Sequence, residues 1–276
     1  MMSDDRPILP AVIGMPRSAS RMTWQTLKFL MPAQRPEWWA PQTPATFFQE
    51  GDWPVRRHSY MVDVPVIYTY RHPVEAYLSY LSRIKQDIGR QVPDVVTSPS
   101  PLTGLHEVDM SKTHLQTEVL AAKEVMKAMG HQWDLYRVLM AEAAEGRKVL
   151  FLKYEDYYDD PHKRVEVICD FMKIEVPDEE RVAEILKFTS LEANAKRGKA
   201  IQDYLPNAIF GHGFHPTTGI QKGHVNMEIM GRPGAHLTSD GLFVASVLHG
   251  IQPAYQALKE MCEYFGYDPG SVSNSE

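Results

Sequence analysis

The stretch from Ile8 to Ser20, ILPAVIGMPRSAS, joins a short apolar run that ends at Gly14 to a turn rich in Pro and Ser. Apolar side chains then recur with helical spacing until Pro32 interrupts the pattern. An apolar run, a turn and an amphipathic run are typical of a strand, a tight turn and a helix. We therefore predict a strand followed by a helix that ends at Pro32.

The same alternation continues along the chain. Further strands are predicted at about 55–60, at 149–153 and at 64–70, where VPVIYTY is the clearest buried strand. Helices are predicted at about 74–84, 111–145 with a break near Gly130, 161–172, 179–188, and once or twice within 239–265. This alternation predicts the α/β fold class, with a central, mostly parallel sheet flanked by helices on both faces. Such sheets bind ligands at the carboxyl ends of their strands.

The length of 276 residues allows one large α/β domain or two small ones, and we expect a single domain over residues 1–276. Three segments without a regular period are expected to be long, irregular loops, at about 32–54, 92–110 and 197–235. Loops of that length in a compact domain usually have a functional role.

Composition and charge argue against several classes of protein. The chain has 29 Lys and Arg against 35 Asp and Glu, so general nucleic-acid binding is disfavoured and any anion site must be a local cluster of cations. Its two cysteines, Cys169 and Cys262, lie far apart, which fits a reducing compartment and gives no disulfide framework or zinc spacing. Residues 1–6 lack the pattern of a signal peptide, and no apolar run approaches membrane-spanning length. We therefore expect a cytoplasmic protein without a membrane partner.

The turn after the first predicted strand has the composition of an anion site. Residues 16–21 combine the N-terminal N–H groups of a helix with Ser hydroxyls and arginines. The alternative is an ordinary helix start with Ser18 or Ser20 as its N-cap. We favour the anion site, because Arg17 and Arg21 would otherwise stand unfavourably at the positive end of the helix dipole. The nucleoside-triphosphate pattern G-x-x-x-x-G-K-[ST] does not occur in the chain, which disfavours an ordinary ATPase.

A second candidate follows the clearest strand. Arg71, His72 and Pro73 come directly after VIYTY, and Ser79 lies eight residues beyond Arg71 on the next predicted helix. Two helical turns separate them, so that Arg71 and Ser79 can face one pocket.

Together these segments resemble the sulfotransferases that use 3′-phosphoadenosine 5′-phosphosulfate (PAPS), of the cytosolic type. The family loop P-[KR]-S-G-[ST]-T-x is matched by residues 16–22, and its R-x-P motif with a later Ser is matched by Arg71, Pro73 and Ser79. The resemblance implies a fold like that of the phosphate-loop NTPases and sulfation of a small molecule. It further implies PAPS as the donor, 3′,5′-adenosine bisphosphate as the product, and no metal.

The resemblance also implies which residues hold the donor. They are Arg17, Ser18, Ala19, Ser20, Arg21 and Met22 in the loop, Arg71 and Ser79, Tyr154, Thr189, Ser190 and Leu191, and Arg232 or else Lys222. Several positions depart from the family pattern. Ala19 replaces a Gly, Arg21 replaces a Thr, and Met22 stands where an aromatic residue often stacks on adenine.

Catalysis needs a base for the acceptor and cations for the leaving phosphate. Lys112-Thr113-His114-Leu115 matches the string that carries the family's base, but it follows Arg71, whereas the family's His precedes that motif. We therefore predict His58 as the base, with Arg56 where the family has Lys and with Arg17 stabilising the leaving phosphate. The neighbouring arginines disfavour protonation of His58, as a proton acceptor requires.

Two other functions stay open on the sequence: an ATP-dependent small-molecule kinase of the phosphate-loop type, and a non-catalytic nucleotide-binding relative. The acceptor is expected to be a small molecule with a hydroxyl or an amine. The sequence leaves its identity open, as it does the oligomeric state, a homodimer included.

Overall fold

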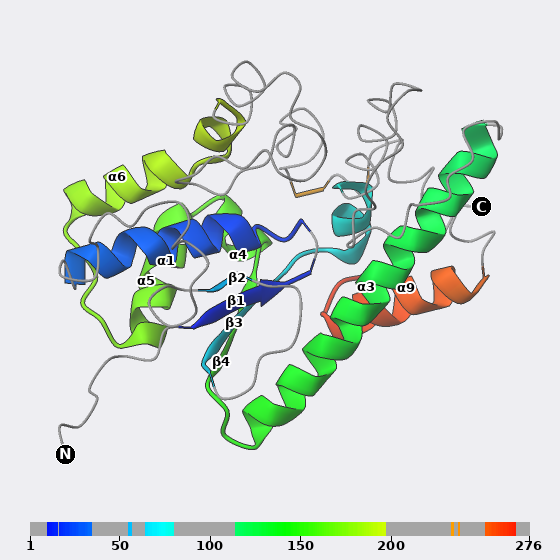
Figure 1. Cartoon of the computed structure of the whole chain (residues 1–276), viewed down its shortest axis with the longest axis horizontal. Helices are drawn as coiled ribbons and strands as arrows, with labels where there is room; N and C mark the ends of the chain where they lie inside the picture. Colours follow the sequence, from blue (N-terminus) through cyan, green and yellow to red (C-terminus); the bar gives the residue numbers. More distant parts are fainter. Residues whose placement is uncertain are drawn as a thin grey trace, which may run out of the picture. The chain divides into compact units, whose positions relative to one another are not determined.

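The computed structural model describes residues 10–15, 17–34, 55–56, 64–79, 114–196, 233–234, 237 and 252–268. Figure 1 shows their helices and strands. The chain divides into two compact units, each of which is considered by itself: the first holds Met1–Tyr70 and Asp134–Ser190, and the second holds Arg71–Trp133 and Leu191–Glu276. One domain over the whole chain stays a prediction.

The first unit is built on a parallel sheet. Its strands are β1 (Ala11–Gly14), β2 (Val55–Arg56), β3 (Val66–Tyr70) and β4 (Val149–Lys153), in the order β2-β1-β3-β4. Every pairing is parallel, and Val12 lies opposite Ile67, which lies opposite Leu150. β2 and β3 lie on opposite sides of β1. Parallel sheets bind ligands at the position where the strand order reverses direction, and here that position is the end of β1. The predicted α/β class with a parallel sheet is confirmed.

Helices cover one face of this sheet. Side chains at alternate strand positions pack against α1 (Ser20–Gln34), α5 (Pro161–Met172) and α6 (Glu179–Thr189), which surround β1, β3 and β4 in Figure 1. The resulting core is apolar throughout: Val12, Leu27, Leu30, Ile67, Leu152, Val165, Ile168, Cys169, Val182 and Ile185. Gly14 and Thr69 are in register with each other and follow Val12 and Ile67 on the same face. The end of β1 and the start of α1 are therefore fixed by one core.

The opposite face of the sheet meets the last part of α3 (His114–Ala144). There Tyr136 packs against Tyr68 and Phe151, with ring centroids 5.2 Å and 4.9 Å away. Both faces of the sheet are thus covered, as predicted. A short helix, α4 (Glu155–Tyr158), follows β4.

The second unit is helical in its described part. Residues 73–79 and 191–196 are helical, and α9 (Gln252–Tyr264) closes the described chain. Trp133 of α3 packs edge-to-face against Tyr264 and in a tilted arrangement against Phe265, at 4.4 Å and 5.4 Å between ring centroids. Each unit contains one cysteine, Cys169 in the first and Cys262 in the second, and both are free and buried. Burial raises the pKa of these thiols, to about 11 for Cys169 and about 12 for Cys262.

Two predicted boundaries are wrong. α1 continues through Pro32 to Gln34. A proline at this position removes one intrahelical hydrogen bond, and only two helical residues follow it. α3 does not break at Gly130, because buried Met126, Met129, Tyr136 and Leu139 continue one apolar stripe across it. The helices at 161–172 and 179–188 are confirmed within one residue. The predicted loop at 92–110 lies outside the described residues, as does all but 233–234 of the loop at 197–235.

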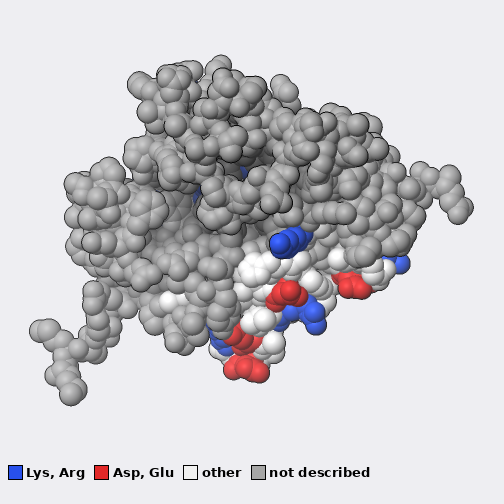
Figure 2. Space-filling view, turned by 45° about the vertical axis from the view of Figure 1, so that its right-hand side comes forward, with Lys and Arg blue, Asp and Glu red and all other residues white. Residues whose placement is uncertain are grey.

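The described surface carries charges of both signs. Figure 2 shows one face on which the described Lys and Arg side chains are interspersed with Asp and Glu. Among the described residues, no helix has both the length and the apolar character needed to cross a bilayer.

Gly14 is the tightest position at the end of β1. A Cβ atom there would lie 2.1 Å from Oγ1 and 2.6 Å from the carbonyl oxygen of Thr69, whereas a Cβ at Gly130 would meet nothing within 4 Å. We expect Gly14→Ala to lower the free energy of unfolding by about 2 to 3 kcal/mol through overpacking. Gly130→Ala, the matched control, should raise it by about 0.5 to 1 kcal/mol through helix propensity. Urea unfolding measures both, and equal effects would contradict the close approach of Gly14 to Thr69.

Candidate functional site

The loop between β1 and α1 has a strained backbone. Arg17 and Ala19 have φ angles of 67° and 65°, in the left-handed region that residues other than Gly rarely adopt. Each costs about 1 to 2 kcal/mol relative to an ordinary conformation. Strain of this kind persists only where the surroundings hold it, and it gathers at functional sites.

Ser18 holds the strained loop in place. Its hydroxyl lies 2.7 Å from the carbonyl oxygen of Met15, 2.8 Å from that of Thr69 and 2.7 Å from Oγ1 of Thr69. Its backbone N–H donates to Met15, whose own N–H donates to the carbonyl of Thr69. The side chain is 1% exposed. Ser18 therefore connects the loop to the end of β3. A contact between its hydroxyl and PAPS stays a prediction.

The first turn of α1 lacks a side-chain cap at its N-cap position. Thr23 donates its N–H to the carbonyl of Ala19 at 3.0 Å, which makes Ala19 the N-cap, and alanine has no acceptor in its side chain. Ser18 is directed to Thr69, and Ser20 is already the first helical residue. The alternative of a Ser-capped helix is thus wrong. The N–H groups of residues 20–22 have no intrahelical acceptor, and together with the helix dipole they favour an anion.

Two arginines flank this helix start in the sequence, and a lysine lies further along the same helix. Arg17 is partly exposed within the loop, whereas Arg21 is buried at 9% exposed, and Met22 beside it is partly buried. Two turns further along, Lys28 is buried with its ammonium 5.4 Å from the ring centroid of Trp24. Burial lowers the pKa of Lys28 to about 8. In a chain of net charge −6, Arg17 and Arg21 are the local cations at this helix start, and an anion site requires such cations.

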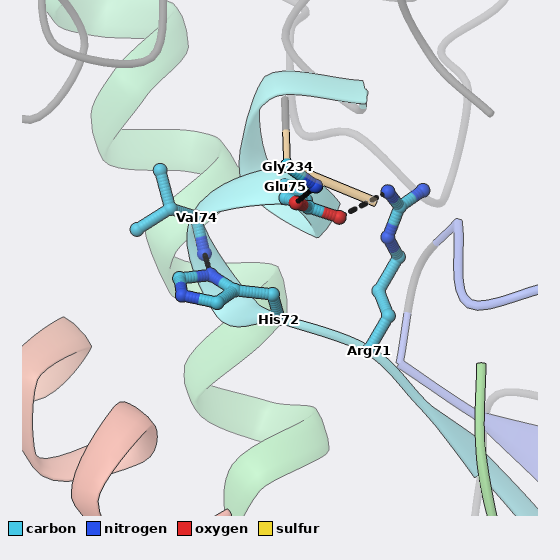
Figure 3. A network of polar contacts seen from close by, with 5 residues as sticks. All are labelled: Arg71, His72, Val74, Glu75 and Gly234. Atoms are coloured by element: carbon cyan, nitrogen blue, oxygen red, sulfur yellow. Dashed lines mark hydrogen bonds and ion pairs between the residues drawn. The ribbon is translucent and has the colours of Figure 1, made fainter. Parts of the chain in front are cut away.

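Arg71 belongs to a second polar network, in the second unit. It is 2% exposed, and its Nη2 atom lies 2.6 Å from Oε2 of Glu75. The other carboxylate oxygen, Oε1, accepts the N–H of Gly234 at 2.5 Å. Figure 3 shows the carboxylate of Glu75 in contact with both the guanidinium and Gly234. Ser79, at the end of the described helical segment, is buried as well.

The helix that carries Glu75 begins in a defined way. Nδ1 of His72 accepts the N–H of Val74 at 3.2 Å, so His72 acts as the N-cap. Pro73 is the first helical residue, where its missing N–H costs nothing. Glu75 then lies in the first turn, where the helix dipole favours a carboxylate. The ring of His72 packs on Tyr267 at 4.7 Å between centroids.

A third group lies in the first unit, around Arg164. This guanidinium is 5% exposed and donates from Nη2 to Oγ1 of Thr189 at 3.0 Å. Burial lowers the pKa of Arg164 to about 10, and the neighbouring phenol of Tyr154 acts in the opposite direction. Tyr154 is itself buried and donates its N–H to the carbonyl of Tyr70 at the end of β3. Arg164 thus lies beside both Tyr154 and Thr189, two residues that are predicted to bind PAPS. This arginine is not among the site residues predicted from the sequence.

The other predicted residues divide into two groups. Ser190 is the C-cap of α6, with its hydroxyl donating to the carbonyl of Lys187, and Leu191 begins the helical segment 191–196. His58, Lys222 and Arg232 lie outside the described residues, as do the side chains of Arg56 and His114. Among the residues that the structure describes, no three His, Cys, Asp or Glu side chains gather as a metal site would require.

Three important residues were missed, and two of them have a weak signal in the sequence. Glu75 stands four residues after Arg71, the spacing of helical ion pairs. Arg164 interrupts the apolar stripe of α5, and a lone cation there indicates a buried partner. Thr69 has no signal at all, because only the register of β1 and β3 places it beside Gly14.

Comparison with known protein families gives one match. A family model described as the sulfotransferase domain matches residues 60–227, more than half of the chain. The match includes Arg71, Ser79, Tyr154 and Thr189, whereas the loop between β1 and α1 lies outside it. A search among curated proteins returned no significant match.

Ala19 offers a direct test of the strained loop. Because its φ is 65°, Ala19→Gly should relieve strain and raise the free energy of unfolding by about 1 kcal/mol. Ala183, exposed within α6, is the matched control, and Ala183→Gly should lower that free energy by about 1 kcal/mol. Urea unfolding distinguishes the two signs. A loss of stability in both variants would show that Ala19 is not strained.

Proposed function

We propose that this chain, which belongs to the sulfotransferase domain family, transfers a sulfuryl group from PAPS to a hydroxyl or amine of a small-molecule acceptor. The observation that carries the proposal is the start of α1. A strained loop, an N-cap without a capping side chain and a partly exposed Arg17 stand at the carboxyl end of β1. That arrangement suits a dense anion such as a phosphosulfate.

Each part of the donor has candidate ligands of matching chemistry. We assign the 5′-phosphosulfate to Arg17 and the backbone of residues 18–22, within a fold like that of the phosphate-loop NTPases. The 3′-phosphate is assigned to Arg71 and Ser79 with Arg232 or Lys222, and the adenine to Tyr154 and residues 189–191. A buried arginine such as Arg71 fits a phosphate because its planar guanidinium donates bidentately.

The proposed reaction is a direct displacement at sulfur. His58 accepts the proton of the acceptor hydroxyl or amine, whose oxygen or nitrogen forms a bond to sulfur. The bond between sulfur and the bridging phosphate oxygen breaks, and its electron pair stays on the departing phosphate. Arg17 stabilises that developing charge without donating a proton, because an arginine keeps its charge at neutral pH. Arg56 supports the same charge from β2.

Chain order supports His58 as the base. It follows Arg56, the last described residue of β2, by two positions, and it precedes Arg71 in the sequence.

Donor binding is tested by ligand-induced stabilisation. With 3′,5′-adenosine bisphosphate at 100 times its dissociation constant, we expect the free energy of unfolding to rise by about 2.7 kcal/mol. The melting temperature should then rise by several degrees, on the order of 2 to 4 °C per kcal/mol for a chain of this size. ATP with magnesium should give a smaller shift. Stabilisation by ATP and magnesium alone would favour the kinase, and no shift with either nucleotide would contradict both.

The catalytic assignment is tested by variants of Arg17 and His58. Arg17→Ala should lower kcat by roughly 10² to 10³ through lost charge stabilisation, and Arg17→Lys should keep most of the rate. His58→Ala should lower kcat by about 10² to 10⁴ with nucleotide binding intact. Turnover is measured with labelled PAPS against a panel of alcohols, phenols and amines. Normal turnover of His58→Ala would exclude it as the base, and nucleotide binding without turnover on any acceptor would favour a non-catalytic relative.

A further inference from the structure

Glu75 is a buried carboxylate with both oxygen atoms engaged. Oε2 pairs with Nη2 of Arg71, and Oε1 accepts the N–H of Gly234, which lies 159 residues further along the chain. Both side chains of the ion pair are almost fully buried, at 2% for Arg71 and 1% for Glu75. Figure 3 shows the two contacts, each made by a different oxygen of one carboxylate.

Only a carboxylate of this length satisfies both contacts. A glutamine has the same size but carries one oxygen and one NH₂ group, and its NH₂ would face either the guanidinium or the N–H of Gly234, both of which are donors. An aspartate is one methylene shorter and reaches less far. Stability alone does not explain such a pair, because apolar residues of similar volume often stabilise the folded state as much as a buried ion pair does. The buried charge therefore points to a functional role.

The ion pair with Glu75 fixes the orientation of the Arg71 guanidinium. A guanidinium is planar, so holding Nη2 fixes the direction of the other N–H groups. Figure 3 shows the other terminal nitrogen of the guanidinium pointing away from Glu75. Bidentate recognition of a phosphate depends on that direction as well as on charge.

The other carboxylate oxygen of Glu75 holds the turn at Gly234. Gly234 has a φ of 90° and accepts the N–H of Leu237 at 3.0 Å, so this part of the chain is a closed turn anchored on Glu75. Arg232, a predicted ligand of the 3′-phosphate, lies two residues before Gly234 in the sequence.

We propose that Glu75 is a positioning residue for the 3′-phosphate site, which holds the guanidinium of Arg71 and the turn at Gly234 as one unit. It does not touch the phosphate and acts through its two partners. The inference rests on the proposed function, because it takes Arg71 as a ligand of the 3′-phosphate.

The test measures selectivity for the 3′-phosphate. Selectivity is the Kd for adenosine 5′-phosphate divided by the Kd for 3′,5′-adenosine bisphosphate, both from calorimetric titration of the full chain. Glu75→Gln should lower this ratio about tenfold or more, as expected for a misdirected charged hydrogen bond, while the affinity for adenosine 5′-phosphate changes little. A role in general stability alone would weaken both nucleotides alike.

Two further variants separate the mechanism from side effects. In Arg71→Gln, the selectivity is already lost, so that adding Glu75→Gln should lower it little further. Glu142→Gln is the matched control, because Glu142 pairs with Arg147 in a partly buried ion pair of the first unit. Its selectivity should equal that of the wild type.

The outcomes keep the two proposals apart. If the wild type prefers the bisphosphate and Glu75→Gln keeps that preference, the role of Glu75 is overturned and the proposed function stands. A wild type without any preference overturns both. Should Glu75→Gln not fold, hydrogen exchange of the wild type decides: the bisphosphate should slow exchange at Gly234 more than adenosine 5′-phosphate does, and equal slowing would overturn the inference.

Discussion

The contact between Ser18 and Thr69 is the interaction on which the candidate site depends. It joins the loop after β1 to the end of the neighbouring strand β3. At this place Thr69 lies so close to Gly14 that residue 14 has no room for a side chain. With the loop held there, Arg17 and Ala19 stay in left-handed conformations that they would not otherwise adopt. Ala19 thereby becomes the N-cap of α1, and its side chain has no acceptor for the first helical N–H groups.

Buried arginines with specific polar partners are a second feature of the candidate site. Isolated charges in a protein interior are strongly unfavourable, so each needs a specific partner. Arg71 has Glu75, and Arg164 has Thr189. Both partners come from a helix that starts or ends beside a predicted ligand of the donor. In each case the contact that satisfies a buried cation also fixes a predicted ligand of the donor, Arg71 in the first pair and Thr189 in the second.

The sequence was most informative where one segment carried its own signal. The alternation of apolar runs and amphipathic helices predicted the parallel sheet, and the order of residues 16–22 and Arg71 indicated the family. It failed where the outcome depends on contacts between segments. Gly130 stays helical because Met129 and Leu139 are buried around it, and the hydrogen bonds between Ser18 and Thr69 exist because β3 lies beside β1. The bridge from Glu75 to Gly234 spans 159 residues, and no local pattern predicts it.

The placement of the two cysteines has a practical consequence. Cys169 lies in the core of the first unit and Cys262 is fully buried in the second, and both are protonated at neutral pH because burial raises their pKa values. A buried thiol reacts with an alkylating reagent only when its surroundings open. The chain thus contains one intrinsic probe for each unit. The rates at which the two thiols become modified report, residue by residue, whether the units open together or one at a time.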